Sequence, residues 1–378
     1  MRRVCSTQRR GSVEPAKKVR LGDVCSAATS QIRQKDIEGI GGRYPIYGAS
    51  GMVGYVDSYQ LEDEGIGIVK DGAGVGRVMR LPKHSAVIGT ILTIRPTADV
   101  DVDYLFYVLC RQNLWSLCTG ATIPHLYFKD FKDKTISLPT LAEQKRIAAV
   151  LDKICELKKN AETRLEKLDT LVKSRFVEMF GDCVLEATLP EICTIIDGDR
   201  GKNYPTQGDF SPEGYCLFLN AKNVTKNGFV FETTSFITQT KDESLRKGKL
   251  LRGDVVLTTR GTIGNIAFFD QNVPYDNVRI NSGMVILRVD IDRVNPVYFI
   301  QAFKSKIQDV ARRLVSGTAQ PQLPISIMSK IMLPLPPLAL QREFAAFVAK
   351  VDKLAFVARQ TVKAMDTLYR AKLQEFFG

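Results

Sequence analysis

Two stretches of the chain carry the same long helical pattern of apolar positions. In the first, apolar residues recur at alternating steps of four and three, at Ile147, Leu151, Ile154, Leu165, Leu168 and Val172. In the second, the equivalent positions are Phe344, Val348, Val351, Val362, Met365 and Tyr369. A sustained heptad is typical of helices that pair along a narrow seam. Because both stretches belong to one chain, we predict that they pair with each other as an antiparallel coiled coil. Each helix would span about 57 Å.

The two helical stretches belong to an internal duplication. A shift of 197 residues aligns 138–181 with 335–378, and 16 of the 44 aligned positions are identical. Chance would give about two or three. Each copy follows a junction with the pattern Gly-x-x-x-Pro-x-Leu, at residues 120–126 and 317–323. Thr140 and Glu143 predict a capping box at the start of the first helix, and glycines 181 and 378 lie where glycine ends a helix.

Short β-rich runs with intervening turns occupy residues 20–137 and 182–334. Each region ends in a helix-like segment just before the repeated junction. The pattern therefore predicts an α+β fold with an internal pseudo-two-fold repeat, in which an antiparallel pair of long helices separates two globular mixed α/β domains. We predict a basic N-terminal tail at 1–19, globular domains at 20–137 and 182–334, and long helices at 138–181 and 335–378.

Composition narrows the class of protein. The chain is 44% hydrophobic and 25% charged, as in soluble globular proteins. It has no run of 18 apolar residues and no apolar segment after its basic N-terminus, so we expect a cytoplasmic protein with no membrane partner. The net charge is +12, but residues 1–20 alone carry +6. Charge by itself therefore supports nucleic-acid binding only weakly.

Catalytic signatures are lacking in the sequence. The glycine-rich run at 71–76 has no following Lys-Ser or Lys-Thr for a nucleotide phosphate. The run Asn-Pro-Val-Tyr at 295–298 is similar to a motif of amino-methyltransferases, but we interpret Asn295 and Pro296 as the start of a helix. Eight cysteines and two histidines are scattered without metal-ligand spacing. We expect no catalytic residue, no metal and no cofactor.

The chain closely resembles the specificity (S) subunits of Type I restriction-modification enzymes. The resemblance rests on the duplicated helices, on YPIYGASGMVGYVDSY at 44–59 and on LRGDVVLTTRGTIGN at 251–265. It implies a non-catalytic subunit whose two globular target-recognition domains each read one half of a bipartite site in double-stranded DNA. It further implies that the paired helices set the spacing and dock two methyltransferase (modification) subunits, which are joined by restriction subunits in some complexes. The basic tail has no counterpart in this pattern.

Side chains that read base edges are mostly Arg, Lys, Asn, Gln, Ser and Thr. In the first globular domain the candidates for DNA binding are Tyr47, Ser50, Lys70, Arg77, Lys83 and His84. In the second they are Arg200, Lys202, Lys222, Asn223, Arg260, Arg279, Asn281, Gln320 and Gln322. Each is also of a type that is common on solvated surfaces or in turns. One alternative stays open, namely a scaffold or adaptor whose globular domains bind proteins rather than DNA.

Overall fold

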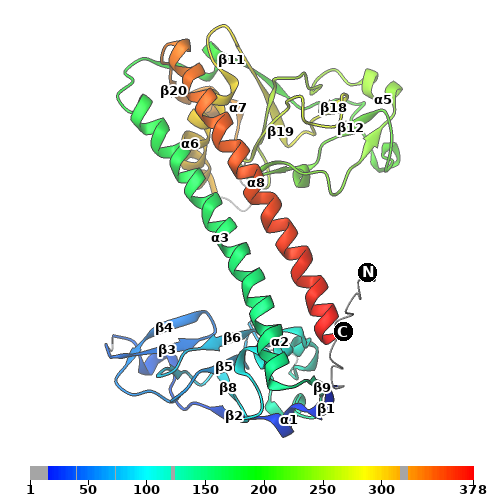
Figure 1. The fold of residues 1–378 in the computed structure, drawn as a ribbon. Helices are drawn as coiled ribbons and strands as arrows, with labels where there is room; N and C mark the ends of the chain where they lie inside the picture. Colours follow the sequence, from blue (N-terminus) through cyan, green and yellow to red (C-terminus); the bar gives the residue numbers. More distant parts are fainter. Residues whose placement is uncertain (1–15, 40, 73, 121–123, 316–321) are drawn as a thin grey trace, which may run out of the picture. The chain divides into compact units, whose positions relative to one another are not determined.

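A computed structural model describes residues 16–39, 41–72, 74–120, 124–315 and 322–378. The chain divides into two compact units (Figure 1). Unit 1 comprises Met1–Glu162 and Arg359–Gly378, and unit 2 comprises Thr163–Ala358. The boundary falls within both long helices, α3 Leu141–Phe180 and α8 Leu338–Phe377. Each unit therefore holds one globular region together with a part of each long helix.

Unit 1 is a mixed α/β structure with three sheets. Its elements, where η is a 3-10 helix, are β1 Lys17–Arg20, α1 Leu21–Val24, β2 Cys25–Thr29, η1 Gln34–Asp36, β3 Tyr44–Gly48, β4 Gly51–Val56, β5 Gly65–Val69, β6 Val78–Leu81, β7 Ala86–Val87, β8 Ile91–Pro96, α2 Val102–Arg111, η2 Leu114–Leu117, η3 Phe128–Asp130 and β9 Thr135–Leu138. One sheet has the order β2-β8-β5-β6 and another β4-β3-β7, while β1 pairs with β9.

The core of unit 1 lies between the four-stranded sheet and α2. All five residues of the central strand β5 are buried, as expected for an apolar run without alternation. The helix α2 starts where the Asp101 carboxylate accepts a hydrogen bond from the amide of Tyr104 at 2.9 Å, which satisfies a donor of the first turn. Its buried face carries Tyr104, Leu105 and Val108. The result is the main apolar core of unit 1, which also takes in the start of α3, beside two smaller clusters.

The end of the predicted basic tail is a strand. Residues 17–19 belong to β1, which pairs antiparallel with β9 from Lys17 opposite Leu138 to Arg20 opposite Thr135. The half-buried side chain of Val19 packs against the unit 1 core. The prediction of a tail up to residue 19 was therefore wrong for 17–19. The backbone of these residues pairs with β9, and the Val19 side chain packs on the core.

Unit 2 repeats this architecture with additions. Its elements are β10 Glu186–Thr188, α4 Leu189–Ile192, β11 Cys193–Asp197, η4 Gln207–Asp209, β12 Cys216–Phe218, η5 Ala221–Asn223, β13 Val224–Thr225, β14 Gly228–Phe229, β15 Phe236–Ile237, α5 Gln239–Ser244, β16 Val255–Thr258, β17 Ile266–Phe268, β18 Val278–Arg279, β19 Met284–Val289, α6 Pro296–Val315, α7 Ile325–Met328 and β20 Met332–Pro334. The sheets have the orders β11-β19-β16-β17 and β15-β12-β18, and β10 pairs with β20.

The sheets of the two units correspond strand by strand. Each has an antiparallel four-stranded sheet, a three-stranded sheet with one parallel pair, and a strand pair that joins the start of the globular region to its end. The hairpin β13–β14 and the helix α5 are additions for which the described part of unit 1 has no counterpart. The predicted repeat of two mixed α/β domains is confirmed at the level of the fold.

The long helices α3 and α8 pack antiparallel in both units. In unit 1 the guanidinium of Arg146 lies 5.7 Å from the Phe376 ring, and Lys158 Nζ is 2.6 Å from Asp366 Oδ1. As the residue number rises along α3, the residue number of the contact on α8 falls, so the two helices run antiparallel. In unit 2 the same antiparallel sense brings Phe180 to 5.5 Å from Phe344, measured between ring centroids. The predicted antiparallel helix pair is confirmed.

The predicted seam lies on the inner faces of these helices. All twelve seam residues are buried or half-buried. In unit 1, Ile147 and Leu151 are part of the globular core, against which Tyr369 packs. In unit 2, Val172 shares a core with Phe344, together with Val348 and Val351. The seam is therefore continuous with the globular cores within each unit.

A glutamine at the start of each long helix joins it to the globular region of its unit. In unit 2 the Gln341 side chain is fully buried, and its Oε1 accepts from the amide of Asn295 at 2.8 Å. Its Nε2 donates to Arg293 O at 3.2 Å and to Pro336 O at 2.8 Å. Gln144 makes the equivalent three bonds in unit 1, with Asp101 N, Asp99 O and Pro139 O. Asn295 caps α6 through its Oδ1, which agrees with the helix-start interpretation of Asn-Pro-Val-Tyr.

We predict that Gln341→Ala lowers the free energy of unfolding by about 2–3 kcal/mol. The substitution leaves one amide and two carbonyl groups without partners in a buried site, where each unsatisfied group costs about 1–3 kcal/mol before relaxation. Urea unfolding followed by circular dichroism measures the effect. The control is Gln360→Ala on the exposed side of α8, expected to change stability by less than about 0.5 kcal/mol. Equal effects of the two variants would contradict the anchoring role.

Candidate nucleic-acid interface

In unit 1 the loops after β3, β5 and β7 meet at one edge of the sheets. β3 and β7 are parallel, with Tyr47 opposite Val87, so both end on the same side. The amide of Ile88 donates to Tyr47 O at 2.9 Å, and the amide of Lys70 donates to Thr90 O at 2.9 Å. These bonds join the loops into one surface. We call it the unit 1 loop surface and define it as residues 47–51, 70–72, 74–77, 88–90 and 124–127.

Four of the predicted DNA-contacting residues lie on this surface. Tyr47 is half-buried against a small apolar cluster, and Ser50 is exposed at the turn between β3 and β4. Lys70 is half-buried at the end of β5, and Arg77 is exposed. Arg77 Nη1 donates to Ala49 O at 3.0 Å, which ties the loop after β5 to the loop after β3. The fold therefore brings together residues that are up to 30 positions apart in sequence.

Lys83 and His84 lie outside the unit 1 loop surface. They occupy the loop that leads into β7, at the opposite end of that strand. Both are exposed. The ring centroid of His84 is 4.9 Å from that of Tyr59, and its Nε2 is 3.8 Å from Glu62 Oε1. These two candidates thus form a separate exposed group with an aromatic neighbour.

A polar pair on the unit 1 loop surface escaped the sequence analysis. His125 Nδ1 lies 2.6 Å from Asp71 Oδ1, and the amide of the neighbouring Leu126 donates to Lys70 O at 2.9 Å. The signal was present in the repeat, because the shift of 197 residues aligns His125 with Gln322, which was a candidate. The junction residues from Pro124 onward therefore contribute to the surface as well.

Unit 2 has an equivalent surface built from the loops after β12, β16 and β18. The amide of Thr259 donates to Gly283 O at 2.8 Å, and the amide of Leu323 donates to Thr259 O at 2.9 Å. The second bond corresponds to the bond from Leu126 to Lys70 in unit 1. We define the unit 2 loop surface as residues 219–221, 259–264, 280–283 and 322–323.

Three predicted residues meet on the unit 2 loop surface. Arg260 forms an isolated antiparallel bridge with Gln322, and both are exposed. The amide of Arg260 donates to Gly283 O at 3.2 Å, and the amide of Gly283 donates to Asn281 Oδ1 at 2.9 Å. Arginine and amide side chains of this kind can form paired hydrogen bonds with guanine and adenine. Gln320 lies outside the described residues.

Arg200, Lys202 and Lys222 flank this group. Arg200 Nη2 is 3.2 Å from both Ser282 O and Asp197 Oδ1, so its guanidinium rests on the loop that holds Asn281. Lys202 is exposed on the loop after β11, and Lys222 is exposed on η5. All three side chains are placed to meet a polyanion, and none is engaged in the core.

Asn223 has an internal structural role, unlike the role expected from sequence. Its side chain is fully buried. Its Nδ2 donates to Val230 O at 3.0 Å and to Thr233 O at 2.8 Å, and its Oδ1 accepts from the amide of Asn220 at 2.9 Å. These bonds close the excursion that contains β13 and β14. A side chain with these partners cannot present its amide to a base, so we exclude Asn223 from the interface.

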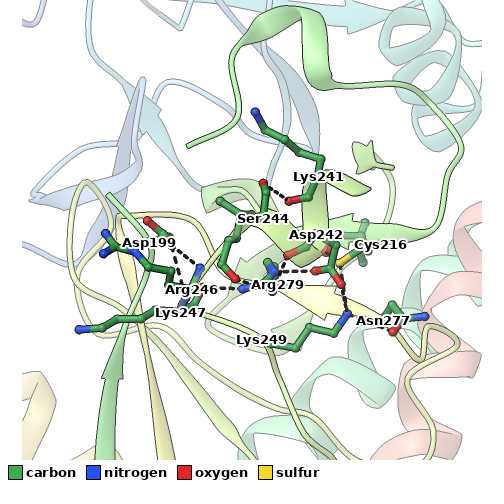
Figure 2. Close-up of polar contacts among 12 residues, drawn as sticks. Asp199, Cys216, Lys241, Asp242, Ser244, Arg246, Lys247, Lys249, Asn277 and Arg279 are labelled. Atoms are coloured by element: carbon green, nitrogen blue, oxygen red, sulfur yellow. Dashed lines mark hydrogen bonds and ion pairs between the residues drawn. The ribbon is translucent and has the colours of Figure 1, made fainter. Parts of the chain in front are cut away.

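Arg279 is also internal, within a buried ionic network (Figure 2). Its Nε lies 2.5 Å from Asp242 Oδ1, and its Nη1 donates to Lys247 O at 2.6 Å. Lys249 Nζ approaches the other oxygen of Asp242 at 2.5 Å. The candidate assignment to DNA was wrong here, because a strand residue that faces inward beside a carboxylate serves packing. Arg279 instead fixes the strand that leads into the 280–283 loop.

The electrostatics of this network favour the charged carboxylate. Burial alone raises the pKa of Asp242, but hydrogen bonds from Lys249 and Arg279 outweigh burial and leave the pKa below its ordinary value. Burial raises the pKa of the adjacent Cys216 thiol to about 12, so this thiol stays protonated at neutral pH. The network therefore acts as a fixed structural element.

The described residues provide no group of three His, Cys, Asp or Glu side chains that could hold a metal ion. In the same part of the chain, no helix combines the length and the apolarity that crossing a bilayer requires. What the two loop surfaces do offer is exposed basic, amide and hydroxyl side chains on rigid strand ends. Two similar folds thus carry these side chains at corresponding strand ends.

Comparison with known proteins identifies the family. The sequence matches the family described as Type I restriction modification DNA specificity domain over residues 14–169 and 185–363. The chain therefore belongs to this family, and it is a specificity subunit that recognises the DNA target within the restriction-modification complex. In the Type I system this subunit is non-catalytic. The resemblance inferred from the sequence is thereby confirmed.

Named relatives and solved structures agree with this assignment. The chain is 26% identical over 330 residues to the Type I restriction enzyme MjaVIII specificity subunit of Methanocaldococcus jannaschii, covering 79% of this chain and 75% of the relative. It is 26% identical over 158 residues to the EcoprrI specificity subunit of Escherichia coli, covering 42% and 36%. The fold is similar to a Type I S subunit from M. genitalium, with a TM-score of 0.68, 18% identity and 98% of each chain covered.

We predict that Asp242→Asn destabilises the protein by about 3 kcal/mol at pH 7, because it leaves Arg279 buried without a counter-charge. The folded-state pKa of Asp242 is lowered, so its contribution is complete above about pH 4 and is lost as the pH falls through the folded-state pKa. The difference between variant and wild type should therefore shrink in acid. Urea unfolding at pH 7 and at about pH 3 measures both effects.

A matched control is Asp276→Asn, which removes an ion pair of 2.7 Å with Arg252 in which the carboxylate is 95% exposed. Exposed pairs contribute about 0–1 kcal/mol, so this variant should remain close to wild type at both pH values. A difference between Asp242→Asn and wild type that stays constant down to pH 3 would show that the carboxylate charge is not what stabilises the network.

Proposed function

We propose that each unit reads one half of a bipartite, asymmetric DNA site. The observation that carries this proposal is the duplication of the loop surface with different side chains in each copy. Unit 1 presents Ser50, Lys70 and Arg77, whereas unit 2 presents Arg260 and Asn281 at corresponding strand ends. Two similar scaffolds with unlike reading groups suit a site whose halves differ in sequence.

We further propose residues 20–137 and 182–334 as the two recognition domains. The first is bounded by the antiparallel pair of β1 with β9, of which residues 17–19 and 138 lie just outside it, and the second begins and ends in the pair of β10 with β20. In the second domain Glu186 lies opposite Pro334, so the chain enters and leaves at one place. A segment with adjacent ends can be exchanged as a block, provided that the donor supplies the residues that contact α3 and α8.

We assign the helices α3 and α8 the roles of spacer and of docking surface for two modification subunits, with restriction subunits as further partners. Support comes from their unbroken length of 40 residues each, about 60 Å at 1.5 Å per residue. The fold is also similar to that of a solved structure that concerns complex assembly of the type I restriction-modification system. The match covers 96% of this chain, with a TM-score of 0.53 and 16% identity. We propose a cytoplasmic location, because this role requires access to DNA.

We predict that exchanging residues 182–334 for the equivalent segment of another specificity subunit changes only one half of the recognised sequence. The chimaera is expressed with its modification subunits, and methylated bases are mapped across the genome. The expected result is a site with one old half, one new half and the same spacing. The reciprocal exchange of 20–137 should change the other half. Alteration of both halves by a single exchange would refute one-half-per-domain reading.

A further inference from the structure

Unit 2 contains two adjoining hollows whose lining residues lie outside the unit 2 loop surface. Their volumes are about 230 and 290 Å³, and they share the lining residues Asp199, Gly201 and Arg246. The wall on one side is the loop after β11, and the wall on the other is the segment after α5 (Figure 2). Both volumes lie below the range of about 300–1,000 Å³ typical of small-molecule sites. They suit a single charged group better than a cofactor.

A buried carboxylate holds the two walls together. Asp199 is 7% exposed, and it accepts hydrogen bonds from the amides of Gly201 at 2.6 Å, Arg246 at 2.7 Å and Lys247 at 3.4 Å. Hydrogen bonds from these backbone amides, that of Gly201 foremost, lower the pKa of Asp199. The carboxylate is therefore ionised and fully occupied by the backbone. Its backbone hydrogen bonds fix the loop at the hollow, and its charge also interacts electrostatically with the guanidinium of Arg246.

The cations around the hollows outnumber the carboxylates. Four basic residues and two acidic ones line them, namely Arg200, Lys202, Arg246, Lys247, Asp197 and Asp199. Arg200 is paired with Asp197 at 3.2 Å. Among the described residues, Lys202, Arg246 and Lys247 have no carboxylate oxygen within 4.0 Å. Three exposed cations without such a partner around a polar hollow attract an anion.

Glycine at position 201 keeps the hollow open. A Cβ on Gly201 would lie 2.8 Å from Arg246 Nη2 and 3.1 Å from Asp199 Oδ1. The guanidinium of Arg246 therefore rests directly on the backbone of Gly201, at the lining of both hollows. Arg279 Nη1 donates a hydrogen bond to Lys247 O, which fixes the segment after α5. The cationic side chains thus project from a backbone that is fixed on both walls.

The hollows adjoin the unit 2 loop surface. A Cβ on Gly198 would lie 2.2 Å from Asn281 O, so the loop after β11 packs directly against the loop after β18. Arg200 Nη2 contacts Ser282 O in the same place. An anion held by Lys202, Arg246 and Lys247 would therefore be a close neighbour of Asn281. In DNA, the anion beside a base edge is a backbone phosphate.

The corresponding loop of unit 1 is built differently. It follows β2, as the loop after β11 follows the equivalent strand of unit 2. It carries the cations Arg33, Lys35 and Arg43, and Arg33 is neutralised locally, with Nε 3.0 Å from Asp36 Oδ2 and Nη2 3.0 Å from Asp36 Oδ1. The helix α5, which leads into Arg246 and Lys247, has no counterpart in the described part of unit 1. The wall that carries Arg246 and Lys247 is thus a feature of unit 2 without an equivalent in the described part of unit 1.

We propose that Lys202, Arg246 and Lys247 bind one phosphodiester group of the DNA backbone and thereby set the register of the unit 2 loop surface on its half-site. The proposal rests on the proposed DNA-reading function of unit 2 and assigns phosphate binding and base reading to different residues of that unit. The hollow supplies affinity without sequence information, and the neighbouring loop surface supplies the reading. No covalent step is involved.

The test compares the double variant Arg246→Gln/Lys247→Gln with wild type, each purified as the full chain with its modification subunits. The probe is a duplex that the wild-type complex selects from a random-sequence library, titrated at several salt concentrations. Loss of one phosphate contact should weaken binding roughly tenfold near 0.1 M salt and reduce the slope of log K against log salt by about one. The sequence that the variant selects should be unchanged.

A control for loss of a surface charge is Lys306→Gln, which removes one exposed cation from α6 and should leave affinity and slope as in wild type. Wild-type affinity and slope in the double variant would overturn the phosphate site, and so would a change in the selected sequence, which would mean base reading. Thermal unfolding of the variants excludes loss of fold as the cause. Failure of the wild-type complex to select any bipartite sequence would instead overturn the proposed function itself.

Discussion

The structure depends on the burial of both long helices in the cores of the globular regions. In unit 2, Phe180 at the end of α3 lies 4.8 Å from Tyr298, and Phe344 near the start of α8 packs on the same ring at 6.4 Å, both between centroids. In unit 1, Phe377 at the end of α8 lies 5.5 Å from Tyr104. Buried aromatic side chains contribute large apolar areas. A helix therefore cannot leave its place without opening a core.

Unit 2 contains arginine side chains in two opposite environments, one buried and one exposed. Arg279 is buried and satisfied by Asp242 and by backbone carbonyls, so it cannot reach a ligand without breaking an internal network. Arg260, which follows β16 of the neighbouring sheet, is exposed, and within the described part of the chain its hydrogen bonds come from its backbone. A buried pair costs desolvation and adds rigidity, whereas an exposed cation keeps its charge for a partner. Rigid loops and free charges are both needed for recognition, and here different residues supply them.

The sequence predicted the helices better than the individual contacts. The seam was predictable because a heptad repeats over many turns and because the second copy repeats it independently. The roles of Arg260 and Arg279 were not, since both lie at the end of a short β segment and only the three-dimensional fold shows which one meets Asp242. Residues 17–19 were assigned to a tail because a four-residue strand with three cations has no periodicity of its own. Its partner, β9, lies more than a hundred residues away.

The duplicated junction shows how one scaffold can carry two different reading surfaces. The amide of Leu126 binds Lys70 O, and the amide of Leu323 binds Thr259 O, at 2.9 Å in both units. Both leucine side chains are buried. These contacts use backbone atoms and apolar packing, so they do not depend on which side chains the neighbouring positions present. At one such neighbouring position unit 1 has His125 and unit 2 has Gln322. The backbone thus fixes the position of a base-reading side chain, while the type of side chain can differ between the two units.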